Sequence, residues 1–452
     1  MSSKLHNGYT ILQTDSNTSS LLQYAWLPMA LLLILGLALR LSFIQADGFK
    51  SDISSFEGWT LGLLAHPTAD FYSTQGFADY PPGYLYVLIA VGHIYKALIH
   101  SDDQLFWLKI AVKMPGIVFD LIDSWLVYLI VRRFASAWQA YVAAACVALN
   151  PAFIIVSGFY GQVDSVPAQM TLLAVLLIIR AYRLSGWALF ATVTGAWLLV
   201  SVSILMKPAA VVVAILFALF PFMRGITNSR RERAVATATG LFAALLIALL
   251  LSAPFHPSNN PTKILSWLYE RYHFASNVYP YNSVNAFNLY SIAQKFWQPD
   301  GQVILSLGSL GIERYEAGIV LFVGATIILG WKLLERQEEI AFLEAAMMLS
   351  LAYFVLLTRM HERYVFNAVM LIAPLVFFRR RYLIALALLS LTLLLNLYYT
   401  LVYQAAVTGA LGIVDSTNLL PLISKPASVL NVLIFLYLGF SFFGSKVRRV
   451  KV

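Results

Sequence analysis

The sequence is dominated by long apolar runs that short polar or basic segments separate. Runs of about 17–25 residues recur from Tyr24 to Ser445, and a helix of that length crosses the roughly 30 Å hydrocarbon core of a bilayer. The runs lack the alternating polarity that the strands of a membrane β-barrel require. The pattern therefore predicts an all-α protein that crosses the membrane many times.

The apolar runs predict a bundle of about twelve transmembrane helices, with eleven to thirteen as the range. The expected spans lie near residues 24–46, 106–131, 137–157, 164–181, 186–205, 208–222, 234–254, 316–334, 339–357, 363–378, 382–403 and 429–445.

The basic residues predict the orientation of these spans. With a cytoplasmic N-terminus, every second loop should be cytoplasmic, and those loops hold the basic clusters. The clusters are Arg132 and Arg133; Arg180 and Arg183; Arg224, Arg230, Arg231 and Arg233; Lys332 and Arg336; Arg379, Arg380 and Arg381; and Lys446, Arg448, Arg449 and Lys451. This agreement predicts that both termini are cytoplasmic.

Residues 83–99 are also apolar enough to span the membrane. A span there would place Arg132 and Arg133 outside and would invert every later cluster. We therefore expect an interfacial or re-entrant helix on the outer side, and a thirteenth span is the alternative.

The expected organisation is one membrane domain with two long outer loops. Residues 1–23 are polar, lack the basic start of a cleavable signal peptide and are expected to be cytoplasmic. The membrane domain covers 24–445 and a basic tail follows at 446–452. The outer loops, about 47–105 and 255–315, are long and rich in polar and aromatic residues, which is typical of functional loops.

Composition narrows the chemistry further. The chain is 60% hydrophobic and 12% charged, and its single cysteine, Cys146, excludes a disulfide framework or a cysteine-based metal site. The net charge of +9 sits in short loops, so it is explained by topology and not by a nucleic-acid partner. No metal-protease, phosphate-loop or hydrolase-elbow motif is present. We expect no cofactor and no tightly bound metal, although a site built only from aspartates stays open.

Asp52 is the candidate general base. It follows the first span closely, so its carboxylate should lie near the membrane surface and accept a proton from a hydroxyl. In a helix from Asp52 to Trp59, Ser55, Phe56 and Trp59 would share its face. The alternative is that Asp52 simply caps an interfacial helix.

Four further outer residues are candidates for substrate binding. Asp79 and Tyr80 precede a double proline that can begin a helix. Gln162 and Asp164 lie where the fourth span begins, and an acidic group at that depth is expensive unless it faces a polar cavity. A helix cap is the alternative for both aspartates.

Outer cations predict a phosphate site. Arg359, His361 and Arg363 surround the junction after the ninth span and break the positive-inside pattern. Guanidinium groups bind phosphate oxygens bidentately, and Lys207 is a weaker candidate for the same role. A cluster that snorkels to the interface is the alternative, and Arg40 in the first span is expected to snorkel.

The second outer loop predicts sugar recognition. Tyr281, Asn285 and Asn288 lie in one stretch of amides and aromatic rings. Amides bind hydroxyl groups and rings stack on the C–H faces of sugars. An aromatic belt at the interface would explain the tyrosines but not the asparagines.

Together these motifs resemble the GT-C class of membrane glycosyltransferases. The first outer loop is similar to that of the dolichyl-phosphate-glucose-dependent glucosyltransferases in the series Asp52, Trp59, Phe71-Tyr72 and Asp79-Tyr80-Pro81-Pro82. Bacterial relatives, often called mannosyltransferases, resemble it in the runs Gly161-Gln162-Val163-Asp164-Ser165, Asn285-Ala286-Phe287-Asn288-Leu289 and His361-Glu362-Arg363-Tyr364.

The resemblance implies a GT-C bundle with an active site on the outer, non-cytoplasmic side. It implies inverting transfer of a hexose, with mannose the expectation from the bacterial relatives, from a polyprenyl-phosphate sugar to a lipid-linked or glycan acceptor. By the same resemblance, Asp52 is the base, His361 and Arg363 contact the donor phosphate, and Gln162 and Asp164 shape the site. Membrane lipid is the other expected partner.

Two other functions stay open at this point. A lipid-sugar transporter or flippase would place ionisable residues near the middle of the bilayer, as Asp120 and Asp123 are. A glycan ligase or polymerase would take its sugar from a lipid diphosphate instead of a monophosphate.

Overall fold

The computed structural model describes residues 26–100, 104–223, 227–258, 260–293, 296–307, 310–407 and 416–444. The expected cytoplasmic segment 1–23, the basic tail 446–452 and Arg224 lie outside these residues.

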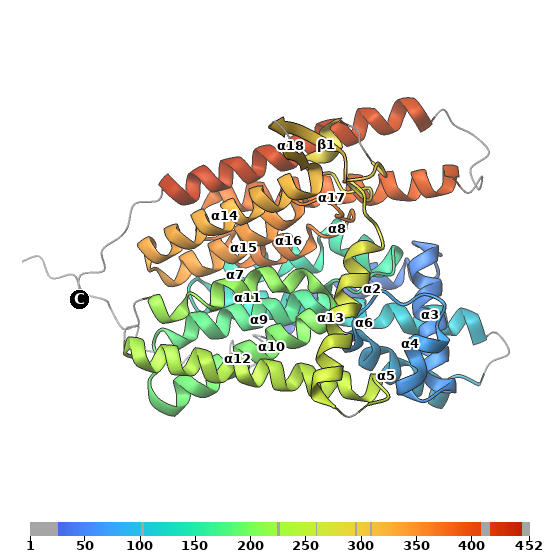
Figure 1. Cartoon of the computed structure of the whole chain (residues 1–452), viewed down its shortest axis with the longest axis horizontal. Coiled ribbons are helices and arrows are strands. Elements are labelled where there is room, and N and C mark those ends of the chain that lie inside the picture. Colours follow the sequence, from blue (N-terminus) through green and yellow to red (C-terminus); the bar gives the residue numbers. More distant parts are fainter. Residues whose placement is uncertain are drawn as a thin grey trace, which may run out of the picture.

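The described chain is almost entirely helical, which confirms the predicted all-α class (Figure 1). The first half contains α2 (Leu27–Leu41), α3 (Lys50–Ala65), η1 (Thr68–Asp70), α4 (Phe71–Thr74), α5 (Pro82–Leu98), α6 (Gln104–Arg132), α7 (Ala137–Ala148), α8 (Pro151–Ile154), η2 (Ile155–Phe159), α9 (Ser165–Ala181), α10 (Gly186–Met206), η3 (Pro208–Ala210), α11 (Val211–Phe217) and η4 (Phe220–Phe222). The second half contains α12 (Arg230–Ser252), η5 (Ala253–Phe255), α13 (Pro261–Asn277), η6 (Tyr290–Ala293), α14 (Arg314–Arg336), α15 (Glu339–Leu356), α16 (Phe366–Ile372), η7 (Ala373–Leu375), α17 (Arg380–Val407) and α18 (Ser416–Gly444). The strands β1 (Val303–Leu307) and β2 (Leu310–Glu313) form one antiparallel pair.

Every expected span coincides with apolar helix, but the count of twelve is not confirmed. In the described residues, seven helices are long and apolar enough to cross a membrane, and the bent pair Ala137–Ala148 and Pro151–Phe159 raises this to eight. The expected spans that remain match shorter apolar helices, namely Leu27–Leu41, Ser165–Ala181, Pro208–Phe222 and Phe366–Leu375.

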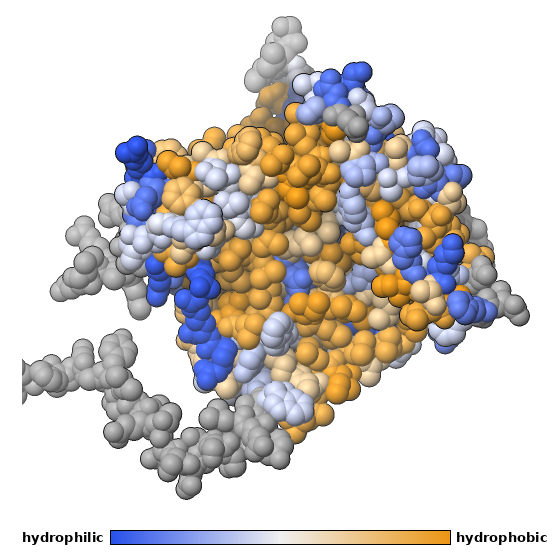
Figure 2. All heavy atoms as spheres, turned by 90° about the horizontal axis from the view of Figure 1, so that it is seen from below, coloured by the Kyte–Doolittle hydropathy of each residue, from blue (hydrophilic) through white to orange (hydrophobic). Residues whose placement is uncertain are grey.

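The outer faces of the bundle are apolar, as a surface in lipid must be. On α12, Phe242 and Leu250 are well exposed, and on α14 so are Val320 and Ile327. In Figure 2 a broad hydrophobic area separates hydrophilic side chains toward the two ends of the molecule. Because apolar surface is stable in hydrocarbon and not in water, this chain is an integral, multi-pass membrane protein.

Several of the basic clusters meet at one end of the bundle. Arg183, just after α9, pairs with Glu339 at the start of α15 at 2.6 Å. Glu344, one turn further along α15, contacts both Arg336 at the end of α14 and Arg381 at the start of α17. The loops that the positive-inside pattern grouped together are therefore neighbours in space.

The prediction that Arg40 snorkels is wrong. Its side chain is fully buried, and its Nε donates to Asp120 Oδ2 on α6 at 3.0 Å. The Nη1 atom donates to the carbonyls of Gly36 and Ala148, so the guanidinium joins α2 to α6 and α7. Asp120 also accepts from Ser157 at 2.6 Å, and it is therefore part of a closed packing contact.

The expected first outer loop is largely helical. The predicted helix from Asp52 to Trp59 lies within α3, and residues 83–99 form α5, which packs on α3, α6 and α10. Figure 1 shows α3 and α13 crossing the direction of the long helices. This crossing places short helices over the end of the bundle where the polar candidates gather.

Candidate active site

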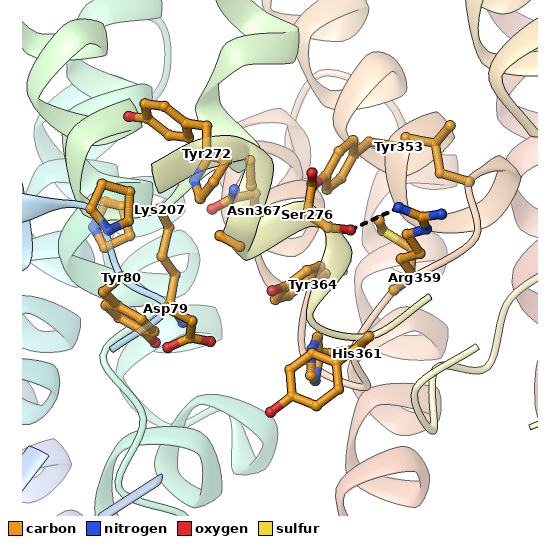
Figure 3. A pocket seen from close by; sticks show the side chains of 18 of the residues that line it. Asp79, Tyr80, Lys207, Tyr272, Ser276, Tyr353, Arg359, His361, Tyr364 and Asn367 are labelled. Atoms are coloured by element: carbon orange, nitrogen blue, oxygen red, sulfur yellow. Dashed lines mark hydrogen bonds between the residues drawn. The ribbon is translucent and has the colours of Figure 1, made fainter. Parts of the chain in front are cut away.

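A cavity of about 490 Å³ lies where the ends of several helices meet. Its lining comes from the loop before α5, the start of α9, the α10–η3 junction, α13, and the junction between α15 and α16. In Figure 3, Lys207, Asp79 and Tyr80 face Tyr353 and Arg359 across the cavity, with His361 and Tyr364 between them. Residues far apart in the sequence therefore share one enclosure.

Asp52 lies in the first turn of α3, beside this cavity. The residue that caps α3 is Phe49, and Asp52 makes no capping hydrogen bond, so its interpretation as a helix cap is wrong. Its Oδ2 instead accepts from Gln162 Nε2 at 2.5 Å and contacts Arg363 Nη2 at 2.9 Å. A carboxylate near a helix N-terminus is favoured by the helix dipole, and the guanidinium adds to that stabilisation.

Gly161 makes this approach of Gln162 to Asp52 sterically feasible. Its φ of +79° lies in the left-handed region, and a Cβ atom there would sit 2.9 Å from Ile53 of α3. Glycine adopts such a conformation without a steric penalty. The turn before α9 can therefore press against the first turn of α3.

Arg363 is the hub of the polar cluster. Its Nη1 contacts Glu362 Oε1 at 2.6 Å, and its Nε lies 3.6 Å from Asp164 Oδ2. The hydroxyl of Tyr160 donates to the same Glu362 oxygen at 3.0 Å. Burial opposes the charge on Arg363, but the surrounding carboxylates raise its pKa well above the ordinary value, so the guanidinium stays charged.

Lys207 supplies a second cation. It lies in extended backbone between α10 and η3, which the following Pro208 favours, and its Nζ contacts Asp164 Oδ1 at 2.7 Å. Asp164 is the N-cap residue of α9, as its helix-cap interpretation expected, but its carboxylate makes no capping hydrogen bond and pairs with cations instead. Burial lowers the pKa of Lys207, and the Asp164 carboxylate opposes that shift.

Asp79 adds a further carboxyl group to the cavity. Burial, together with the charge of Asp52, raises the pKa of Asp79 to about 6. Tyr80, the next residue, lies with its ring 5.5 Å from Lys207 Nζ and also lines the cavity. The first turn of α5 is capped by Pro81, so neither residue acts as a helix cap.

His361 lies in the cavity, but it is not a cation. Burial, and next the charge of Arg363, lower the pKa of His361 to about 3. At neutral pH its imidazole is therefore uncharged and offers one N–H donor. The rings of Tyr279 and Tyr364 lie 5.0 Å and 5.1 Å from it.

Arg359 also lines the cavity, on the side away from Asp79 and Lys207 (Figure 3). Its guanidinium contacts Asp300 at 2.7 Å and donates to Asn277 and to the carbonyl of Ser276. It also lies over the Tyr315 ring. These contacts tie the segment before β1 and the end of α13 to the residues after α15, so the geometry favours a structural role over the predicted phosphate contact.

The expected sugar-binding stretch is buried next to the residues of the cavity and does not line the cavity itself. Asn288 is buried, and its amide is engaged with the carbonyl of Leu357 and the amides of Tyr290 and Ser291. Asn285 accepts from Trp297. These two asparagines and Tyr281 are absent from the residues that line the cavity.

Asn285 has a different use in the structure. Its backbone has a φ of 63° and pairs with His361, and its carbonyl accepts from Asn396 at 2.5 Å. Asparagine tolerates this left-handed conformation better than most residues. The stretch therefore fixes the backbone around His361.

Sequence reasoning missed several residues that complete the site. Glu362 and Tyr160 orient Arg363, and Tyr279, Tyr353 and Asn367 line the cavity. Glu362 could have been found from the sequence, because an acidic residue directly before Arg363 can pair with it. The tyrosines had no signal, because aromatic residues are frequent throughout this chain.

One wall of the cavity is apolar. Met206 and Phe366 lie near the polar cluster, and Ile319 and Leu357 lie on the side toward α14 and α15. Ile319 is itself 38% exposed on the outer surface of α14, so the apolar wall continues to the lipid-facing surface. Such a cavity accommodates a molecule with a charged head and a hydrocarbon tail.

Comparison with known families supports the membrane glycosyltransferase resemblance. Residues 105–257 match the family described as dolichyl-phosphate-mannose-protein mannosyltransferase. The resemblance to the GT-C class is confirmed. This family match runs from α6 to the residues after η5 and includes Gln162, Asp164 and Lys207, whereas Asp52 and Arg363 lie outside it.

A solved structure similar to this chain is the archaeal oligosaccharyltransferase AglB from Archaeoglobus fulgidus in complex with an inhibitory peptide and a dolichol-phosphate. The TM-score is 0.44 at 14% identity, over 93% of this chain and 56% of that chain. The chain thus spans little more than half the length of AglB. Comparison with curated proteins finds no match.

No group of three or more potential metal ligands converges in the part of the chain that the structure describes. The acidic side chains around the cavity are instead paired with cations, as Asp164 is with Lys207. The expectation that no tightly bound metal or other cofactor is needed stays a prediction.

Proposed function

We propose that this protein is a glycosyltransferase that moves a hexose from a polyprenyl-monophosphate sugar to a lipid-linked or glycan acceptor. The observation that carries the proposal is the contact of Asp52 with Arg363, which lines a cavity that Lys207 also lines and that has an apolar wall. A base, two phosphate-binding cations and space for a lipid tail are the groups that this reaction needs.

Asp52 acts as the general base. Both of its contacts, from Gln162 and Arg363, go to Oδ2, and among the described residues Oδ1 is left for an acceptor hydroxyl. Asp52 takes the hydroxyl proton while the acceptor oxygen forms a bond to the anomeric carbon. The bond between that carbon and the phosphate oxygen breaks, and the configuration inverts. The leaving group is the polyprenyl phosphate, which needs no general acid.

Arg363 and Lys207 stabilise the charge that grows on the leaving phosphate. Both are buried, so water screens their charges poorly and the stabilisation is larger than it would be at the surface. The donor phosphate competes with Asp52 and Asp164 for these cations, and the apolar wall toward α14 holds the polyprenyl chain.

Mannose is the proposed sugar, and the non-cytoplasmic face is the proposed site of reaction. The description of the matching family supports mannose. The grouping of Arg183, Arg336 and Arg381 at the other end of the bundle supports the orientation, because basic loops stay in the cytoplasm.

The test is transfer by membranes that contain the protein, with radiolabelled polyprenyl-phosphate mannose and then glucose as donors. We expect a labelled lipid-linked or glycan product from the mannose donor. Label released only from a lipid-diphosphate donor would establish a ligase or polymerase instead. Donor that crosses liposome membranes without covalent change would establish a transporter.

A further inference from the structure

A second cavity, of about 450 Å³, lies at the opposite end of α9 and α15 from the candidate active site. Asp164 precedes α9 and lines the first cavity, whereas Arg180 in its last turn lines the second. Sixteen residues of α-helix separate them by about 24 Å, which approaches the thickness of the hydrocarbon core. The second cavity therefore lies near the other membrane surface.

The walls of this cavity are hydrocarbon. They are formed by leucine, isoleucine and phenylalanine side chains from the end of α6, the second half of α9, the start of α15 and the segment before α17. Leu129 and Phe134 are 44% and 53% exposed, so this lining continues onto the lipid-facing surface. A space with this lining at this depth suits an acyl chain from the neighbouring leaflet.

The charge at the mouth of the cavity is positive. Arg133, Arg180 and Arg183 line it together with Glu339. Arg183 and Glu339 form a bidentate pair, with contacts of 2.6 Å and 3.1 Å, and neutralise each other. Among the described residues, neither Arg133 nor Arg180 forms an ion pair, and both are exposed at the end of their helix.

We propose that this cavity binds an anionic diacyl phospholipid, with its phosphate between Arg133 and Arg180 and an acyl chain along the leucine wall. Guanidinium groups match phosphate oxygens in geometry and charge. An uncharged lipid would leave two arginines without a counterion. A zwitterionic head group would bring a second cation toward them. The charge of the cavity mouth therefore selects an anionic head group.

Native mass spectrometry of the purified chain in neutral detergent tests this site. The protein is titrated with phosphatidylglycerol and, in parallel, with phosphatidylcholine of the same acyl chains. We expect tighter binding of phosphatidylglycerol, and a double variant R133Q/R180Q to weaken it about 25-fold, since each arginine near an anionic head group contributes about fivefold. Binding of phosphatidylcholine should stay within twofold.

The matched control is R132Q/R231Q, which removes the same charge from residues that do not line the cavity. It should weaken binding of phosphatidylglycerol less than twofold. Equal losses in the two double variants, or equal affinity for the two lipids, would overturn the proposal. Thermal unfolding without added lipid should be the same for both variants, which distinguishes lost binding from lost structure.

Two further arms identify the occupant. Leu129→Trp fills the apolar space and should weaken phosphatidylglycerol binding with both arginines intact, whereas an unchanged affinity would place the lipid elsewhere. Glycerol phosphate that competes as well as the intact lipid would define a site for free anions. Polyprenyl phosphate that binds more tightly than phosphatidylglycerol would define a second site for a reaction component. Either result overturns the phospholipid assignment.

Discussion

Two arginine–aspartate pairs in this protein have nearly the same contact distance and different surroundings. Arg40 contacts Asp120 at 3.0 Å, and Arg363 contacts Asp52 at 2.9 Å. In the first pair both side chains are fully buried, whereas in the second the exposed fractions are 7% for the arginine and 26% for the aspartate. Arg363 lines the first cavity, whereas neither Arg40 nor Asp120 lines either of the two cavities described above.

The difference shows what separates a packing contact from a site. The Nε and Nη1 atoms of Arg40 donate to Asp120 and to the carbonyls of Gly36 and Ala148, so the pair joins three helices. Arg363 contacts carboxylates and also lines a cavity that can hold a ligand. A buried ion pair by itself therefore does not indicate function, and access to a cavity is what distinguishes the two.

The largest expected effect is loss of transfer in Asp52→Asn. Removal of a general base typically costs about 10²–10⁴-fold in rate, and the amide cannot accept the acceptor proton. The initial rate of mannose transfer, with the amount of folded protein measured in parallel, checks this. The control is Glu57→Gln on the same helix, which should retain full activity. Normal turnover by Asp52→Asn would refute the base assignment.

Disruption of the Arg40–Asp120 pair should lower stability and leave the rate of transfer unchanged. Arg40→Met leaves Asp120 buried without its partner, and breaking a buried ion pair costs about 3–5 kcal/mol of stability. Denaturation in detergent measures the loss, and the rate per folded molecule should be unchanged. If Arg40→Met lowered the rate per folded molecule as much as Asp52→Asn does, the contrast between the two pairs would fail.

Removal of the second cation should weaken donor binding. Lys207→Gln deletes a charged contact to phosphate, and such hydrogen bonds contribute about 1.5–3 kcal/mol, so we expect the KM for the donor to rise at least tenfold. Steady-state kinetics with each substrate varied in turn measure this. A rise in the KM for the acceptor alone would place Lys207 in the acceptor site and contradict its contact with the donor phosphate.

The smallest expected effect is on the pH profile. The pKa of Asp79 is raised to about 6, so its carboxyl group is neutral below that pH and charged above it. The negative charge should repel the donor phosphate and lower kcat/KM about two- to fivefold as the pH rises through 6. Asp79→Asn should remove this step, and a step that persists in the variant would assign it to another group.

The same shift has a consequence for stability. The folded-state pKa lies above the ordinary value of 3.8, so the folded protein binds this proton more tightly than the unfolded chain. The stabilisation from neutral Asp79 is complete below about pH 4 and is lost as the pH rises through about 6. In Asp79→Asn, this part of the pH dependence of unfolding should disappear.

Much of the site could be named from the sequence because its residues violate rules that lipid imposes. Asp164 at the predicted membrane depth and Arg363 on the predicted outer side would both be costly alone, and the structure pairs them with Lys207 and Asp52. The asparagine stretch was harder to interpret. Asn288 forms hydrogen bonds with buried backbone groups, a role that an amide fills as readily as sugar binding.

The sequence by itself determined that the chain is helical, crosses a membrane many times and gathers its basic loops on one side. These properties follow from the lengths of apolar runs and from the cost of charge in hydrocarbon, both of which act locally along the chain. Only the tertiary structure decided which charged side chains form buried pairs with each other and which line a cavity. Arg40 and Arg363 carry the same group, and what each one contacts depends on helices that are distant in sequence and packed together in space.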